Sequence, residues 1–130
     1  MRSSQKREKP RAPIGVGIDL EDVHRFAVLD QKKDQRFLHR IFTPAERTYC
    51  FRRANAGQHL AGRFAAKEAV KKALHSVGLH RVSYRDIEIS NDAHGAPRVR
   101  LAGTKRWRIA LSMSHSVEVA VAIAIITARL

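Results

Sequence analysis

Residues 62–74 read GRFAAKEAVKKAL, and this segment constrains the fold more than any other because small residues recur along one side of a predicted helix. Four of them share that side on a 3.6-residue period: Gly62, Ala66, Ala69 and Ala73. The pattern predicts a long helix from about residue 58 to 76, closed by Gly78. A face this small can pack tightly, so the fold must bring a neighbouring element close to it.

The same helix carries an acid among bases. Glu68 lies among four cationic residues: Arg63, Lys67, Lys71 and Lys72. A second acid, Asp19, ends an apolar strand pattern in which Ile14, Val16 and Ile18 alternate with glycines. Hard cations such as Mg²⁺ are held by few carboxylates together with water and substrate oxygens, and bases bind phosphates. These residues therefore indicate a candidate site for phosphate transfer.

Both acids also have an ordinary structural interpretation. Glu68 and Lys72 are four residues apart, and such an intrahelical ion pair stabilises a helix by about 0.2–0.5 kcal/mol. Asp19 could cap a helix that begins at Leu20. By spacing alone the structural role is the more common one, so position does not decide between the two interpretations.

The other elements follow from local patterns. Thr43, Pro44 and Glu46 form a capping box with proline at the first helical position, which predicts a helix over residues 44–54. Glycines at positions 15 and 17 allow another backbone or a ligand to approach the first strand. The remaining predictions are a strand at 14–19, a broken helical region at 21–40, a hairpin of strands 83–90 and 97–101, and strands at 109–114 and 117–126.

The composition fits one globular domain of 130 residues, with a basic flexible tail at residues 1–13 and a single domain at 14–130. No segment is apolar enough to span a bilayer, and the lone Cys50 cannot form an internal disulfide, which predicts a cytoplasmic location. The net charge of +13 calls for an anionic partner. The charge does not distinguish between three kinds of anionic partner: nucleic acid, an acidic carrier protein and a phosphate-rich cofactor.

Several reaction classes lack their sequence motifs. Ser114 is not within a G-x-S-x-G elbow, and the sequence contains no P-loop and no Cys/His metal cluster. Ser112, Ser114 and His115 end a predicted strand and offer two hydroxyls and an imidazole to a phosphate or ribose. A lone histidine at a strand end is more often structural, so His115 is not by itself a catalytic base.

Five motifs in order resemble the holo-[acyl-carrier-protein] synthase family, over about residues 14–127. They are GVGIDLEDVHRF (15–26), RIFTPAE (40–46), LAGRFAAKEAVKKAL (60–74), DIEISNDAHGAPRV (86–99) and SMSH (112–115). The resemblance implies a 4′-phosphopantetheinyl transferase that moves the phosphopantetheine arm of coenzyme A onto a serine of apo acyl carrier protein. It also implies that Mg²⁺ is required and that adenosine 3′,5′-bisphosphate is released.

The resemblance also implies roles for individual residues. Asp19 and Glu68 hold Mg²⁺ against the coenzyme A pyrophosphate, and Lys72 neutralises or protonates the leaving phosphate, so Glu68 and Lys72 are the catalytic candidates. Arg63, Lys72, Ser114 and His115 are the candidate contacts for coenzyme A. The general base for the incoming serine is left open between a metal-bound water and Glu68, and the role of Lys67 in the motif could be structural.

The family fold implied is α+β, with an antiparallel sheet packed on the long helix and homotrimers whose active sites lie between protomers. An acidic carrier protein explains the basic residues 25–40 better than nucleic acid does, with Arg25 and Arg36 as the best-matched contacts. Whether the carrier serves fatty acid or polyketide synthesis is left open. The alternative function is a non-catalytic basic module that binds nucleic acid or an acidic protein.

Overall fold

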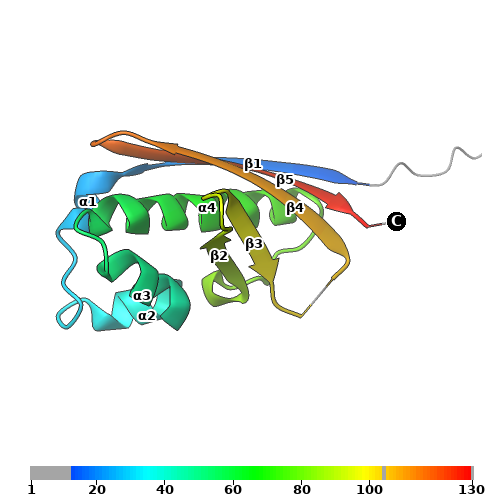
Figure 1. Cartoon of the computed structure of the whole chain (residues 1–130). Helices are drawn as coiled ribbons and strands as arrows, with labels where there is room; N and C mark the ends of the chain where they lie inside the picture. The colour runs from blue at the N-terminus through cyan, green and yellow to red at the C-terminus, as the bar shows by residue number, and fades with distance from the viewer. Residues whose placement is uncertain (1–12, 104, 130) are drawn as a thin grey trace, which may run out of the picture.

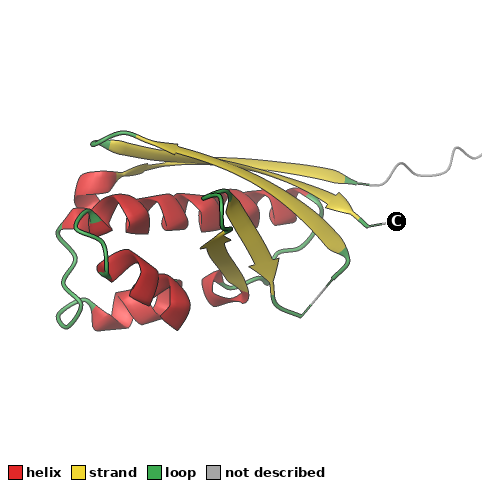
Figure 2. Cartoon of the chain, in the orientation of Figure 1, coloured by secondary structure: helices red, strands yellow, loops and turns green. Residues whose placement is uncertain are grey.

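The computed structural model describes residues 13–103 and 105–129, and their fold is α+β (Figure 2). In chain order the elements are β1 (Ile14–Asp22), α1 (Val23–Ala27), α2 (Gln35–Ile41), α3 (Pro44–Phe51), α4 (Ala56–Ser76), a 3₁₀ turn η1 (Tyr84–Asp86), β2 (Ile87–Asn91), β3 (Pro97–Leu101), β4 (Trp107–His115) and β5 (Val119–Ala128). The predicted antiparallel sheet on a long helix is confirmed.

The central helix α4 separates two layers. An antiparallel sheet of order β1-β5-β4 covers one side, and the β2–β3 hairpin with α2 and α3 lies on the other (Figure 1). One core cluster fills the space between α4, the sheet and the hairpin, and a second joins α1, α2 and α3 to the first half of α4. Both layers pack against α4, and this packing fixes the position of its residues relative to both sheets.

The small side of α4 packs against the sheet as its sequence predicts. Ala66, Ala69 and Ala73 are fully buried, and the facing alanines of β5, at 120, 122 and 124, are buried as well. A Cβ atom built on Gly17 would lie 2.0 Å from the carbonyl oxygen of Ala69. The glycines of β1 therefore admit the backbone of α4, one of the two possibilities raised by the sequence.

Replacing Gly17 with Ala is expected to lower the free energy of unfolding by about 1–3 kcal/mol or more, because the added methyl meets rigid backbone. Gly62→Ala is the matched control, since its Cβ would lie 3.1 Å from the flexible end of Met113 and alanine favours the helix. Urea denaturation of both variants measures the difference. Equal stabilities would contradict the proposed close packing of β1 on α4.

The outer face of the sheet is apolar and open to solvent. On β1 the exposed fractions are 57% for Val16, 60% for Ile18 and 65% for Leu20. The neighbouring residues of β5 are also exposed, and Ile18 pairs in register with Ile123. Single exposed apolar residues are common, but a contiguous patch marks a surface for association.

Several boundaries differ from the sequence predictions. β1 continues to Asp22 because that residue still pairs with Val119 of β5, so Asp19 lies inside the strand and the helix cap is Asp22. The strand predicted from residue 83 begins at Ile87, because Ser83 and Asp86 close a capped 3₁₀ turn first. The capping box that starts α3 is confirmed, although the helix ends at Phe51.

Other predicted elements need smaller adjustments. α4 starts at Ala56, and β4 and β5 begin at Trp107 and Val119. The hairpin is confirmed, with Gly95 at φ 82° in its turn. The predicted tail at residues 1–13 lies almost wholly outside the described residues, and its boundary stays a prediction. Within the described part, no helix is both long and apolar enough to cross a membrane.

Candidate active site

Strand β1 and helix α4 bring Asp19 and Lys72 together. Lys72 Nζ lies 3.1 Å from Asp19 Oδ1 and donates a second hydrogen bond to the carbonyl oxygen of Ile18, at 2.9 Å. The Asp19 side chain is 12% exposed, whereas that of Lys72 is 53% exposed. The carboxylate is thus held at the edge of the core while the ammonium group faces solvent.

Glu68 lies one turn of α4 before Lys72 and has a different partner. The hydroxyl of Tyr84 donates a hydrogen bond to Glu68 Oε1. Among the described residues Lys72 forms its ion pair with Asp19, so the intrahelical Glu68–Lys72 pair considered from the sequence is not formed. Burial of Tyr84, followed by its contact with Glu68, raises the pKa of the phenol to about 12. The phenol therefore remains a donor at neutral pH.

Glu21 is a further acid at this place that the sequence analysis did not single out. It lies two residues after Asp19 on the same face of β1, and its carboxylate is 3.6 Å from the guanidinium of Arg25. Burial first, and then the neighbouring Asp19 and Glu68 carboxylates, raise the pKa of Glu21 to about 7. The period-2 pattern of a strand that reaches past Asp19 was the signal available for it.

Glu21 should make folding stability depend on pH. Its pKa is raised in the folded state, so the folded protein binds more protons than the unfolded chain between about pH 4.5 and 7. The contribution of Glu21 is complete below pH 4.5 and is lost as the pH rises through 7. Urea midpoints at several pH values should show a smaller fall over this window for Glu21→Gln than for the parent. An unchanged pH dependence would argue against the raised pKa.

The acids of this site fit a hard divalent cation. Asp19 Oδ2 is buried and has no hydrogen-bond partner among the described residues apart from the neighbouring Glu21 carboxyl when that carboxyl is protonated, so once Glu21 is ionised the oxygen is one that a cation can satisfy. Mg²⁺ typically takes one or two carboxylates and completes its shell with water and substrate phosphates. The described residues contain no cluster of three or more His, Cys, Asp or Glu side chains suited to a metal. Asp19 and Glu68 supply the two carboxylates that such a site needs, and their assignment to a cation stays a prediction.

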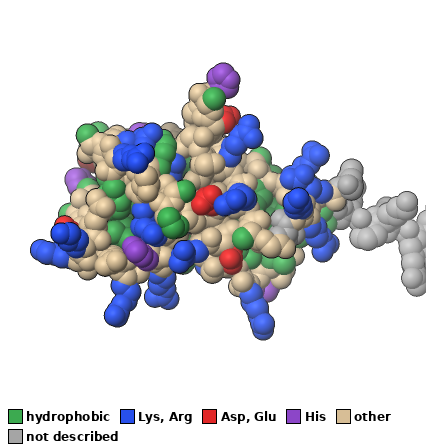
Figure 3. Space-filling view, turned by 60° about the horizontal axis from the view of Figure 1, so that its bottom comes forward, with side chains coloured by type: hydrophobic (Ala, Val, Ile, Leu, Met, Phe, Trp, Pro, Cys, Tyr) green, Lys and Arg blue, Asp and Glu red, His purple; other side chains and the backbone are tan. Residues whose placement is uncertain are grey.

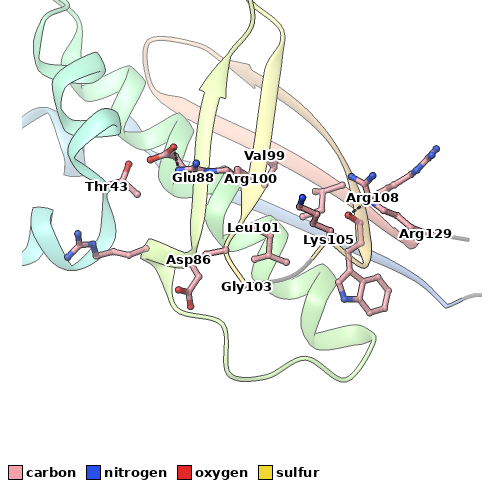
Figure 4. Close-up of a pocket in the computed structure, with 14 residues that line it drawn as sticks. Thr43, Asp86, Glu88, Val99, Arg100, Leu101, Gly103, Lys105, Arg108 and Arg129 are labelled. Carbon is pink, nitrogen blue, oxygen red and sulfur yellow. Dashed lines mark hydrogen bonds and ion pairs between the residues drawn. The ribbon is translucent and has the colours of Figure 1, made fainter.

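Two cavities differ in their relation to these acids. A cavity of about 180 Å³ adjoins Lys72 and is lined by Lys71, Lys72, His75, Leu79, His80 and Val82. A larger one of about 1180 Å³ lies between the β2–β3 hairpin and β4, near Thr43, Glu88, Arg100, Lys105 and Arg108 (Figure 4). None of the candidate catalytic residues lines the larger cavity. The smaller cavity borders the acidic site through Lys72, which lines it.

Arg63 is buried on the side of α4 that faces β2. It donates a hydrogen bond to Asn91 Oδ1 at 2.9 Å, and its guanidinium carbon lies 3.8 Å from the ring centroid of Tyr49. Its Nε has no partner among the described residues. Burial, and then the charges of Arg53, Arg63 and His115, lower the pKa of His59. The cations around Arg63 form an environment that favours an anion.

Ser114 and His115 end β4, whereas Asp19 lies on β1, and β5 separates these two strands. In register, His115 pairs with Ala120 and Asp19 with Ala122, so the residues occupy opposite edges of the sheet. The structure thus unites Asp19, Glu68 and Lys72 within one chain. Among the described residues it brings none of Arg63, Ser114 and His115 into contact with these three.

Lys67, the other base of the helix motif, is fully buried. Its Nζ lies 2.7 Å from Glu46 Oε1 and donates to the carbonyl oxygens of Tyr84 and Ile87. These contacts join α4 to α3, η1 and β2. The structural role considered for Lys67 from the sequence agrees with this placement.

The candidate carrier contacts lie on the surface of the helical layer. Arg25 in α1 is exposed, and its guanidinium lies 5.5 Å and 5.6 Å from the ring centroids of Phe26 and Phe64. Arg36 in α2 is also exposed. In the face shown in Figure 3, Lys and Arg side chains project at many points and acidic side chains are few. This surface suits an acidic partner.

Comparison with known proteins identifies the family. The 4′-phosphopantetheinyl transferase superfamily matches residues 15–125. The holo-[acyl-carrier-protein] synthase of Protochlamydia amoebophila is 41% identical over 117 residues, which span 86% of this chain and 96% of that protein. The corresponding enzyme of Moorella thermoacetica is 43% identical over 121 residues, 87% and 93% of the two chains.

Solved structures agree with these relatives. A crystal structure of the holo-(acyl-carrier-protein) synthase of Bacillus anthracis in complex with CoA (3′,5′-ADP) has a TM-score of 0.74 and 35% identity, covering 91% of this chain and 99% of that one. The acyl carrier protein synthase of Mycobacterium tuberculosis has a TM-score of 0.67 and 38% identity, covering 90% and 100%.

The family match over residues 15–125 and the similar solved structures thus define a transferase of the phosphopantetheinyl type. Within that superfamily the chain belongs to the holo-[acyl-carrier-protein] synthase family of enzymes. The family resemblance stated from the sequence is confirmed, whereas the roles of individual site residues stay predictions.

Proposed function

We propose that this protein transfers the 4′-phosphopantetheine group of coenzyme A to a serine of an apo acyl carrier protein, with Mg²⁺ as cofactor. The serine hydroxyl gives its proton to a base as its oxygen forms a bond to the β-phosphorus of coenzyme A. The bond from that phosphorus to the bridging oxygen breaks, and adenosine 3′,5′-bisphosphate leaves with the electron pair of that bond on its phosphate oxygen. The observation that carries the proposal is the contact of Asp19 with Lys72, one helical turn from Glu68, at a place where one buried Asp19 oxygen has no partner in the geometry of the described residues.

Asp19 and Glu68 would hold the Mg²⁺ ion, which neutralises charge on the pyrophosphate when bound. Lys72 is the residue best placed to meet the leaving phosphate. Its ammonium group is half exposed and already lies at the edge of the acidic pair, so it can neutralise or protonate a phosphate oxygen without leaving the site. The cationic cavity beside it, with His75 and His80, accommodates further phosphate charge.

Arg63, Ser114 and His115 are proposed to bind the nucleotide end of coenzyme A. They lie away from Asp19 within one chain, so we place them in the site of an adjacent copy. The apolar outer face of β1 and β5 supports this assembly, because its in-register residues Ile18 and Ile123 would be covered by a second copy. A homotrimer with sites between protomers follows as the proposed assembly.

An Ile18→Lys variant tests that assembly. The side chain points outward and is 60% exposed, so each chain should keep its fold while the charge prevents association. Mass measurement in solution should show monomers for Ile18→Lys and trimers for the parent, and transfer should fall with the loss of assembly. Full activity in a monomer would refute sites shared between copies.

The acyl carrier protein is proposed to dock on the basic surface around Arg25 and Arg36. An acidic helix complements exposed guanidinium groups, and such charges mainly raise the rate of association. The reaction is proposed to take place in the cytoplasm, in keeping with the reduced, buried Cys50. Assays with fatty acid and polyketide carriers would distinguish the two candidate pathways.

The experiment that tests the function is incubation of the protein with coenzyme A, Mg²⁺ and apo carrier protein, followed by mass measurement of the carrier. The expected result is a gain of one phosphopantetheine, and none when Mg²⁺ is chelated. A binding module would have no use for carboxylates in a cationic site, since they repel an anionic ligand. No mass gain with several carriers, together with tight binding of nucleic acid, would favour that alternative.

A further inference from the structure

Tyr84 is held in place by three contacts that do not involve its hydroxyl. Its carbonyl oxygen accepts a hydrogen bond from the buried Lys67 Nζ at 2.8 Å. Its ring lies 5.8 Å from the ring of Phe64 at an interplanar angle of 29°, and Lys71 Nζ lies 3.9 Å from its centroid. The ring therefore has little freedom, and the direction of its hydroxyl is fixed by the fold.

That hydroxyl donates to Glu68 Oε1. Tyr84 lies on the 3₁₀ turn η1 and Glu68 on α4, so the bond joins two elements across the edge of the site. A carboxylate held through one oxygen presents its other oxygen in a defined direction. Groups that orient metal-binding side chains in this way typically contribute about 10- to 100-fold to metal affinity or activity.

We propose that Tyr84 is a positioning residue, whose hydroxyl orients the Glu68 carboxylate toward Asp19 for binding of the divalent cation. This inference rests on the proposed function, since it assigns Glu68 to the cation. A merely structural Tyr84 would instead contribute through its ring and backbone, which contact Phe64, Lys71 and Lys67. Removal of the hydroxyl alone separates the two roles.

Tyr84→Phe keeps the ring and deletes the hydroxyl. Titration of the protein with Mn²⁺ in the presence of coenzyme A, followed by the electron paramagnetic resonance signal of free Mn²⁺, should give a dissociation constant about tenfold higher for Tyr84→Phe than for the parent. The Mg²⁺ concentration for half-maximal transfer should rise by a similar factor. Unchanged Mn²⁺ affinity in a folded variant would overturn the inference.

Ser83→Ala is the matched control. Ser83 Oγ lies 2.9 Å from Asp86 Oδ2 in the capping box of the same turn, so its loss loosens η1 and leaves the Tyr84 hydroxyl in place. This variant should lower the melting temperature and preserve Mn²⁺ affinity. If it weakens Mn²⁺ binding as much as Tyr84→Phe does, the effect belongs to the turn as a whole and the inference fails.

A double-mutant cycle covers the case in which Tyr84→Phe also loses stability. The inference expects the stability loss to shrink when Tyr84→Phe is made in a Glu68→Ala background, because the hydroxyl then has no carboxylate at position 68 to bond. An equal loss in both backgrounds would contradict it. A parent protein that neither binds Mn²⁺ nor transfers phosphopantetheine would instead refute the proposed function, and this inference with it.

Discussion

Glu68→Gln is expected to reduce phosphopantetheine transfer by about 10²- to 10³-fold while the protein remains folded. Stabilisation of developing charge by a bound cation contributes several kcal/mol, and each 1.36 kcal/mol corresponds to about a tenfold change in rate. Glutamine keeps the shape of Glu68 and can still accept the hydrogen bond from Tyr84, but it removes the charge that the cation requires. The measurement is the initial rate of carrier modification at saturating Mg²⁺.

Glu88→Gln is the control for that variant. Glu88 lies on β2, where it pairs with Arg100 at 2.9 Å, and in the part of the chain that the structure describes it forms no ion pair or hydrogen bond with Asp19, Glu68 or Lys72. Its transfer rate should match that of the parent. Retention of Mg²⁺-dependent activity by Glu68→Gln, at a rate near that of Glu88→Gln, would remove Glu68 from the cation site.

The surroundings of Glu68 show which contacts of the site the sequence predicts and which it does not. Helical spacing places Lys72 next to Glu68 and predicts an ion pair between them. In the structure β1 lies so close to α4 that Lys72 pairs with Asp19 instead. The small residues of α4 and the glycines of β1 make this approach possible. The packing was predictable from the sequence, whereas the choice between two carboxylates depends on the distance between elements.

Nothing in the sequence pattern predicts that Tyr84 contacts Glu68. It lies 16 residues beyond Glu68 in a segment that alternates like a strand, and a local cap turns it into a 3₁₀ turn. The sequence also does not predict that the apolar face of β1 is exposed, because large apolar residues normally predict burial. Its residues are exposed because the glycine side of the strand is the one that fits against the helix. Both the Tyr84–Glu68 contact and the exposed face of β1 depend on how elements distant in the sequence pack together.

The capping box at residue 43 was predicted for its local role, and the structure gives its glutamate a second one. Glu46 Oε1 accepts a hydrogen bond from the Thr43 amide at 2.8 Å, and Glu46 Oε2 accepts one from the Ile89 amide at 2.8 Å. The same carboxylate pairs with Lys67 at 2.7 Å, and both side chains are fully buried. Glu46 thus caps the start of α3 and also bonds this helix to α4 and β2.

Glu46→Gln should therefore lower the free energy of unfolding by about 3–5 kcal/mol, because it leaves the buried Lys67 charge without its partner. Burial lowers the pKa of Lys67, and the charge of Glu46 opposes that effect, so the lysine should lose its proton more readily in the variant. Glu88→Gln, whose partner Arg100 is 79% exposed, should cost less than about 1 kcal/mol. Urea denaturation monitored by circular dichroism compares the two variants.

A second substitution separates the charge from the packing. Adding Lys67→Met to Glu46→Gln removes the unpaired ammonium group and keeps a side chain of similar length, so part of the lost stability should return. If the double variant is no more stable than Glu46→Gln, contacts other than the charge pair account for the loss: the capping box, the bond to Ile89, or the carbonyl oxygens of Tyr84 and Ile87 that Lys67 no longer meets. Because Lys67 also holds the carbonyl oxygen of Tyr84, the double variant should weaken Mn²⁺ binding even where stability is recovered.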